Sequence, residues 1–167
     1  MLDRHSALEN AKPYLGQGLT IVEAPDFVLT QYAGSEKELK KALGKIPARV
    51  GVALANEGQI QFRISGMQIW ALGEPMAAEG CYITPLTSSR TRIAIVGAPV
   101  RVVLAKLTAI DFHSKLFKPG MFAQTGIHHT PVLIHCTGQN AFHIYAMRTF
   151  ALSVWETVTD AALEFAE

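Results

Sequence analysis

Histidines are the side chains of this sequence that most readily suggest chemistry, because imidazole binds metals and transfers protons near neutral pH. His128 and His129 are adjacent, so on a strand they would point to opposite faces and could not share one metal. Across a hairpin, His135 and His143 could approach each other on one face, joined by His113 from a preceding loop. Zinc needs three or four ligands at bonding distance. We therefore favour polar or interface roles for these histidines over a metal site.

The sequence shows no recognisable nucleophile or phosphate-binding loop. Ser88 and Ser89 precede a predicted strand without a G-x-S-x-G elbow, and Cys81 and Cys136 have no cysteine nearby. Neither a P-loop nor a G-x-G-x-x-G motif follows a strand, and the Gly-Gln-Gly at residues 16–18 is not followed by a helix. These patterns argue against acyl transfer and dinucleotide binding.

The remaining polar and aromatic candidates also have simpler structural roles. Asp111 has apolar neighbours and could be a base with a raised pKa, but we favour a capping carboxylate that accepts backbone N–H groups. Arg90 and Arg92 could form an anion site, although pairing with acids on the strand face is the favoured reading. Trp70 and Trp155 are more typical of core or interface anchors. We predict no catalytic, cofactor-binding or metal-binding residue in this chain.

Length and composition narrow the class of protein. The chain has 167 residues, of which 49% are apolar and only 17% charged, with a formal net charge of +1. An average soluble domain carries about 25% charged residues. The low charge and high apolar content exclude a disordered chain, and the absence of a basic excess argues against nucleic-acid binding. Two cysteines suit a reducing compartment.

The stretch Pro119–Met147 contains no Asp, Glu, Lys or Arg and is long enough to span a bilayer. It nevertheless contains four histidines and breaks into short alternating runs, which argues against a transmembrane helix. The N-terminus has no apolar core typical of a secretory signal. We therefore expect a cytoplasmic protein.

Apolar periodicity and turn residues predict two similar series of elements. The first has strands at 19–23 and 27–32, a helix after Ser35 that ends at Gly44, and strands at 60–64 and 67–72. A linker with a short extended piece follows over 74–85. The second has a strand at 90–96, a helix from Pro99 to about 107, strands at 121–127, 132–136 and 142–147, and a final helix capped by Thr149. In that last helix, Phe150, Val154, Val158 and Leu163 would form one apolar stripe with Trp155 beside it.

The two series look like variants of one βαββ(α) unit. We predict an irregular N-terminal arm over residues 1–17 and a single globular domain over 18–167, with repeat halves at about 18–75 and 87–165. Repeated units of this kind favour an α+β fold with antiparallel sheets and helices packed on one face.

An ordered set of motifs runs through the second half of the chain. It contains Ser88–Ala98 (SSRTRIAIVGA), Val103-Leu104, Ile110–His113 (IDFH), Phe117–Gly120 (FKPG), Ala123–Thr125 (AQT), Phe142–Tyr145 (FHIY) and Arg148–Trp155 (RTFALSVW), preceded by Ile69–Gly73 (IWALG). This set resembles the gamma subunit of heterotetrameric sarcosine oxidase. Thr149 stands where that family usually has Ser.

The resemblance implies a non-catalytic subunit of an oxidase complex. In that family, the complex oxidises sarcosine to glycine, passes the one-carbon unit to tetrahydrofolate and reduces oxygen to hydrogen peroxide. The alpha and beta subunits hold FAD, FMN, NAD and folate, and the delta subunit holds zinc. The gamma subunit is similar in fold to the aminomethyltransferase-type folate-binding domain, packs on the alpha subunit and binds no cofactor of its own.

The sequence is also compatible with other functions. Related complexes such as N-methylglutamate dehydrogenase carry similar subunits, so the N-methyl amine substrate is not determined. A stand-alone folate-binding aminomethyltransferase-like protein is a second hypothesis, although such enzymes are about twice this length. A metal-dependent enzyme built on His113, His135 and His143 is a third.

Overall fold

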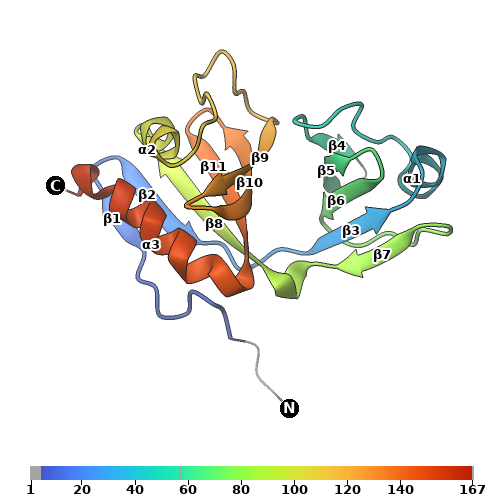
Figure 1. The fold of residues 1–167 in the computed structure, drawn as a ribbon, viewed down its shortest axis with the longest axis horizontal. Coiled ribbons are helices and arrows are strands. Elements are labelled where there is room, and N and C mark those ends of the chain that lie inside the picture. The colour runs from blue at the N-terminus through green and yellow to red at the C-terminus, as the bar shows by residue number, and fades with distance from the viewer. Residues whose placement is uncertain (1–4, 57, 167) are drawn as a thin grey trace. The chain divides into compact units, whose positions relative to one another are not determined.

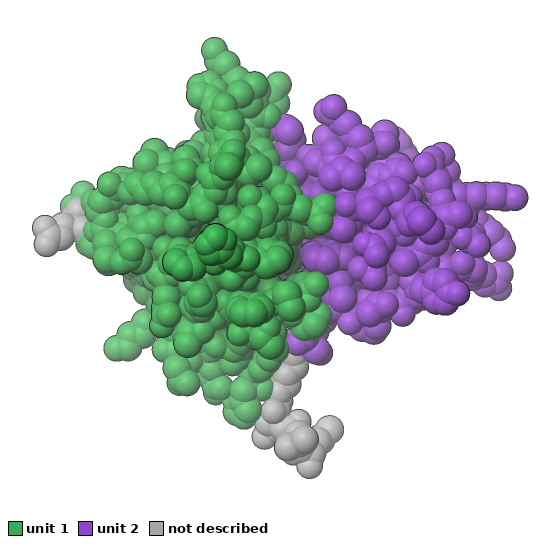
Figure 2. All heavy atoms as spheres, viewed as in Figure 1, with its two compact units in different colours: residues 1–25, 89–119, 123–167 green, residues 26–88, 120–122 purple. Residues whose placement is uncertain are grey.

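The computed structural model describes residues 5–56 and 58–166. Within them, the chain forms two compact units, coloured separately in Figure 2. The described part of unit 1 comprises residues 5–25, 89–119 and 123–166, and that of unit 2 comprises 26–56, 58–88 and 120–122. The sequence prediction of one globular domain over residues 18–167 did not anticipate this division.

A five-stranded antiparallel sheet and one helix form the framework of unit 2 (Figure 1). The elements are β3 (Leu29–Ala33), α1 (Glu36–Leu43), β4 (Leu54–Asn56), β5 (Gln59–Ser65), β6 (Gln68–Leu72) and β7 (Tyr82–Pro85). The strand order is β4-β5-β6-β3-β7. Tyr32, Leu39, Leu43 and Ile69 are buried together, so the apolar stripe of α1 packs with side chains from β3 and β6.

A six-stranded antiparallel sheet carries two helices in the other unit (Figure 1). Its strands are β1 (Tyr14–Gly16), β2 (Leu19–Glu23), β8 (Arg90–Gly97), β9 (Phe122–Ile127), β10 (Thr130–Gly138) and β11 (Ala141–Met147), in the order β1-β2-β8-β11-β10-β9. The helices α2 (Val100–Leu107) and α3 (Ala151–Ala161) contact each other and β8. Short 3-10 turns form η1 (Thr87–Ser89), η2 (Arg148–Phe150) and η3 (Leu163–Phe165).

The two sheets repeat one topology, as the sequence predicted. Each contains a strand, a helix and three further strands, and in each the first strand pairs with the last of the three. This gives β4-β5-β6-β3 in one sheet and β9-β10-β11-β8 in the other. The α+β class with antiparallel sheets is therefore confirmed. The second repeat has the three strands after its helix that were predicted, and the first has one strand more after its helix, β4, than was predicted.

The predicted boundary of the first repeat was wrong at its beginning. The strand Leu19–Glu23 was assigned to the first half, but it pairs with β8 of the second repeat, where Leu19 lies opposite Gly97. Edge pairing of this kind satisfies backbone N–H and C=O groups that β8 would otherwise expose. Strand β4 was missed because three residues are too few to show an alternating pattern.

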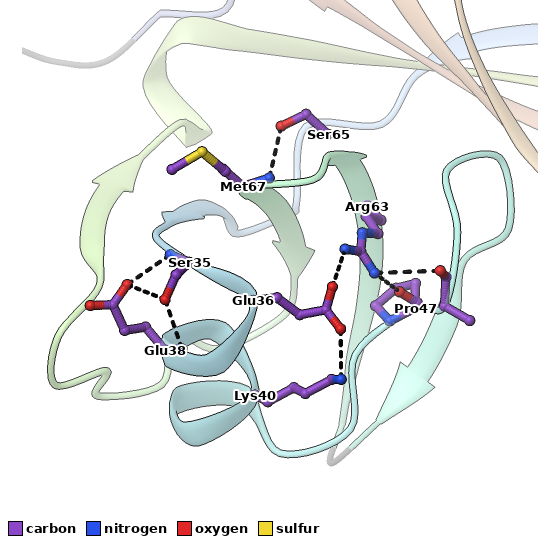
Figure 3. A network of polar contacts seen from close by, with 9 residues as sticks. Ser35, Glu36, Glu38, Lys40, Pro47, Arg63, Ser65 and Met67 are labelled. Atoms are coloured by element: carbon purple, nitrogen blue, oxygen red, sulfur yellow. Dashed lines mark hydrogen bonds and ion pairs between the residues drawn. The ribbon is translucent and has the colours of Figure 1, made fainter.

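Helix α1 begins as the sequence predicted, and polar contacts hold it to the sheet (Figure 3). The hydroxyl of Ser35 accepts a hydrogen bond from the amide of Glu38, whose carboxylate accepts one from the Ser35 amide, which makes a capping box. Arg63 on β5 donates to the Glu36 carboxylate at 2.9 Å, and Lys40 contacts the same carboxylate at 2.6 Å. These two cations lower the pKa of Glu36 to about 2.

The N-terminal segment is more ordered than predicted. The predicted irregular arm over 1–17 contains β1, and Leu8 is buried. The hydroxyl of Tyr14 donates to the carbonyl of Ala162 at 2.5 Å, and the amide of Gln17 donates to Phe165 at 2.6 Å. The arm prediction was wrong for residues 14–16 because these partners lie near the other end of the chain. Residues 1–4 of the predicted arm lie outside the described part.

The final helix begins later than predicted. Thr149 belongs to η2, and the residue before α3 is Phe150, which makes no side-chain cap. Val154, Trp155 and Val158 are buried as predicted, but Phe150 is 48% and Leu163 59% exposed. These two positions flank the helix, so its 3.6-residue period does not carry them onto the buried face.

The uncharged stretch from Pro119 to Met147 forms β9, β10 and β11 rather than a helix, as its alternating runs indicated. Among the described residues, no helix is both long and apolar enough to cross a membrane.

Candidate functional site

Two histidines that the sequence singled out lie on the paired strands β10 and β11 of unit 1. His135 and His143 are directly opposite each other in the register of these strands, as the hairpin prediction required. His135 is buried, and Tyr145 and Arg92 lie on the same face in the adjoining register positions. His113 is exposed on the α2–β9 loop, where its Nδ1 accepts a hydrogen bond from the Lys115 amide. Among the described residues, no group of three or more His, Cys, Asp or Glu side chains is placed to hold a metal.

Burial keeps both histidines neutral. Desolvation lowers the pKa of His135 to about 4, helped by the nearby His143. Desolvation likewise lowers the pKa of His143 to about 4, with a further contribution from the positive charge of Arg92. Burial raises the pKa of Tyr145, so its phenol is a weaker acid than that of a solvent-exposed tyrosine. The two imidazoles and the phenol are therefore uncharged near neutral pH, and Arg92 is the charged member of this face of the sheet.

Acidification is expected to destabilise the chain through this histidine pair. In the unfolded chain both imidazoles have a pKa of about 6.5, so between pH 6.5 and 4 the unfolded state binds more protons than the folded state. Stability is therefore complete above pH 6.5 and falls as the pH drops towards 4. The free energy of unfolding in urea should be lower at pH 5 than at pH 7 by about 2–3 kcal/mol, with the larger share from His135, because His143 is only half-buried and solvent screens part of its effect.

The variant His135→Gln/His143→Gln provides the control for this pH effect. It should lose most of the difference in unfolding free energy between pH 7 and pH 5. If this variant kept the full wild-type difference in unfolding free energy between pH 7 and pH 5, groups other than these histidines would cause the acid sensitivity.

The adjacent pair His128 and His129 forms the turn between β9 and β10. Both residues have positive backbone φ angles, 46° and 67°. The prediction considered them on a strand with opposite directions, but a two-residue hairpin turn needs this left-handed backbone. His128 lines an open groove beside α3 together with Glu156 and Asp160.

The other sequence candidates have structural roles. The Asp111 carboxylate accepts a hydrogen bond from the His113 amide at 2.8 Å, which confirms the capping interpretation. Arg92 donates to the carbonyl of Ala24 at 3.0 Å, and Arg90 donates to Ser89. The indole of Trp70, which is half-buried, donates to Gln31, and Trp155 is buried.

Neither thiol is activated as a nucleophile. Burial raises the pKa of Cys81 and that of Cys136. The Cys136 thiol is buried and donates to the carbonyl of Gly138. Ser88 and Ser89 belong to η1, and the Gly-Gln-Gly at 16–18 connects β1 with β2.

The residue that sequence reasoning missed is Arg101 on α2. Its guanidinium donates to the carbonyls of Phe112 at 2.6 Å and Phe117 at 2.9 Å, and twice to the carbonyl of Gln139, at 2.8 and 3.0 Å. It also lies 5.0 Å from the centre of the Phe142 ring. No sequence signal pointed to it, because backbone carbonyls accept hydrogen bonds whatever the residue type.

These contacts anchor the loop over residues 108–121, which joins α2 to β9. Phe112 and Phe117 are buried and pack against each other and against Phe142, with ring centres 5.1 to 6.1 Å apart. Between them, the amides of Leu116 and Phe117 donate to the carbonyl of His113. The loop therefore has a fixed base while Leu116 at its outer side is 59% exposed.

Comparison with known proteins gives a family and a fold. The sequence model of the family described as "Sarcosine oxidase, gamma subunit family" matches residues 70–164. A chain of heterotetrameric sarcosine oxidase from Corynebacterium sp. U-96 is similar in structure, with a TM-score of 0.86 and 20% identity over 98% of this chain and 97% of that chain. A search of curated proteins finds no match.

A second similar structure is the glycine cleavage system aminomethyltransferase T from Bartonella henselae, with a TM-score of 0.57 and 16% identity. The alignment covers 86% of this chain but only 46% of the aminomethyltransferase. The shared part therefore corresponds to about half of that protein and shows a likeness of fold.

Proposed function

Because the chain belongs to the sarcosine oxidase gamma subunit family, we propose that it is the non-catalytic gamma subunit of a heterotetrameric sarcosine oxidase. The family match over residues 70–164 is the observation that carries this proposal. The fold likeness to a chain of the Corynebacterium complex, over nearly the full length of both chains, supports it.

The proposed complex is an oxidoreductase that converts sarcosine to glycine. It transfers the one-carbon unit to tetrahydrofolate and reduces oxygen to hydrogen peroxide in the cytoplasm. FAD, FMN, NAD and folate are bound by the alpha and beta subunits and zinc by the delta subunit. The gamma subunit contributes assembly and stability by packing on the alpha subunit.

The described side chains support a structural role for this subunit. The buried histidines are neutral and lie opposite each other in a sheet, and the thiols have raised pKa values. Asp111 caps a turn, and Arg101 is committed to backbone carbonyls. The groups that sequence reasoning considered for catalysis thus hold the fold together.

Co-production with the neighbouring reading frames tests the proposal. The chain should purify in a stable complex with a large flavoprotein, and that complex should oxidise sarcosine with formation of hydrogen peroxide. The chain alone should bind no flavin and turn over no sarcosine. A stable monomer that does not associate with the flavoprotein would exclude the subunit role.

A second candidate function is suggested by the likeness to the aminomethyltransferase. A stand-alone folate-binding protein would bind tetrahydrofolate directly, and isothermal titration calorimetry of the isolated chain measures this.

Comparing sarcosine with N-methylglutamate as substrates of the assembled complex separates a sarcosine oxidase from the related N-methylglutamate dehydrogenase.

A further inference from the structure

The loop over residues 108–121 contains no helix or strand, and its residues 108–119 belong to unit 1. It leaves α2 after Leu107 and enters β9 at Phe122. Figure 1 shows it projecting well beyond the adjacent helix and strand ends. Loops of this length without regular structure are uncommon in compact folds, and those that are ordered are commonly functional.

The base of this loop is fixed before any partner binds. The buried rings of Phe112 and Phe117 pack with Phe142, and the guanidinium of Arg101 bonds the carbonyls of both loop phenylalanines. The Asp111 carboxylate additionally holds the amide of His113. A preorganised loop loses little conformational entropy when it docks, so its outer side chains retain more of their binding energy.

The outer side of the loop presents one apolar side chain among basic ones. Leu116 is 59% exposed, and Lys115 and Lys118 next to it are also exposed. Asp111, which is bonded to the His113 amide, is the last carboxylate before Glu156 in the sequence, so every charged side chain from residue 112 to 155 is a lysine or an arginine. A leucine bordered by ammonium groups is complementary to an apolar pocket with an acidic rim.

We propose that residues 111–119 form a preformed docking loop that inserts Leu116 into an acidic-rimmed apolar pocket on the alpha subunit of the oxidase complex. This inference rests on the proposed subunit role and adds the surface and the chemistry of its partner. Leu116 supplies the apolar anchor, and Lys115 and Lys118 pair with carboxylates at the rim, where their attraction speeds association.

The test compares Leu116→Asp with Leu163→Asp in the complex produced with all its subunits. Both leucines are 59% exposed, and both lie in unit 1, so the two substitutions change surface polarity equally. Leu116→Asp should weaken association at least tenfold, measured by titration of the purified subunit against the remaining complex, with an unchanged melting temperature. Leu163→Asp should associate like the wild type.

The outcomes separate this inference from the proposed function. If the wild-type chain does not associate with the oxidase subunits, the proposed function fails. If the wild type associates and Leu116→Asp associates equally well, or if both aspartate variants are equally impaired, the docking loop is excluded while the subunit role stands.

Charge reversal tests the acidic rim independently. The double variant Lys115→Glu/Lys118→Glu should weaken association, and the deficit relative to wild type should shrink as ionic strength rises, because salt screens exposed charges. An unchanged affinity at low salt, or the same deficit at every salt concentration, would contradict an acidic partner surface.

Discussion

Replacement of Gly97 by alanine is expected to destabilise the chain by more than about 3 kcal/mol, since backbone strain and a steric clash act at the same residue. Gly97 ends β8 with a φ angle of 143°, a conformation that side chains with a Cβ rarely adopt. An added Cβ would lie 2.0 Å from the carbonyl oxygen of Gly18 and 2.8 Å from the Cα of Leu19. These are backbone atoms of the β1–β2 turn and of β2, so no side-chain rotation relieves the clash.

Gly18→Ala is the matched control for this prediction. Gly18 also has a positive φ angle, 65°, but an added Cβ there would meet no atom within 4 Å. The control therefore carries only the left-handed backbone cost of about 1–2 kcal/mol. Urea unfolding followed by circular dichroism measures both variants. Equal losses of stability in the two variants would show that the close approach of the Gly18 and Leu19 backbone to Gly97 does not contribute to the loss in Gly97→Ala.

Replacement of Arg101 by alanine is expected to cost about 3 kcal/mol of stability and to release the α2–β9 loop. Its guanidinium bonds three carbonyls, on Phe112, Phe117 and Gln139, and a hydrogen bond to a charged group contributes a net stabilisation of about 1.5–3 kcal/mol. Arg101→Lys should recover only part of this loss, because one ammonium group cannot span three acceptors as a guanidinium does.

Hydrogen exchange distinguishes loop release from a uniform loss of stability. In Arg101→Ala, the amides of Leu116 and Phe117 should exchange much faster, while those of β8 should change only with global stability. Arg49→Ala, an exposed arginine in unit 2, serves as the control and should change stability by less than about 0.5 kcal/mol. Unaltered exchange at Leu116 and Phe117 in Arg101→Ala would contradict the anchoring role.

Features with a short-range cause were predictable from the sequence. The Ser35 cap, with Glu38 three residues later, acts within one helical turn, and α1 begins where that pattern places it. The alternating runs between residues 119 and 147 were interpreted as strands, and they form β9 to β11. The expectation that His135 and His143 meet across a hairpin was confirmed by the strand register, since a hairpin brings together residues close in sequence.

Features that depend on distant partners were not predictable in this way. The side chain of Arg101 has no distinctive neighbours in sequence, and its acceptors lie 11 to 38 residues away. Strand β1 contains three residues and is held by contacts with the C-terminal segment, including Tyr14 to Ala162. Phe150 and Leu163 fit an apolar stripe, yet they are exposed because they lie just outside the helix that carries it.

The sequence by itself determined the repeated strand–helix–strand pattern, the α+β class and the family. Periodicity, helix caps and ordered motifs each depend on residues that are close together in the sequence. Only the tertiary structure decided that β2 joins the sheet of the second repeat and that Arg101 fixes the α2–β9 loop. It also decided that Leu116 is presented at the surface rather than buried with Phe112 and Phe117. The physical reason is that these contacts join segments far apart in the chain. A backbone carbonyl finds its donor, and a side chain becomes buried or exposed, only when those segments have packed together.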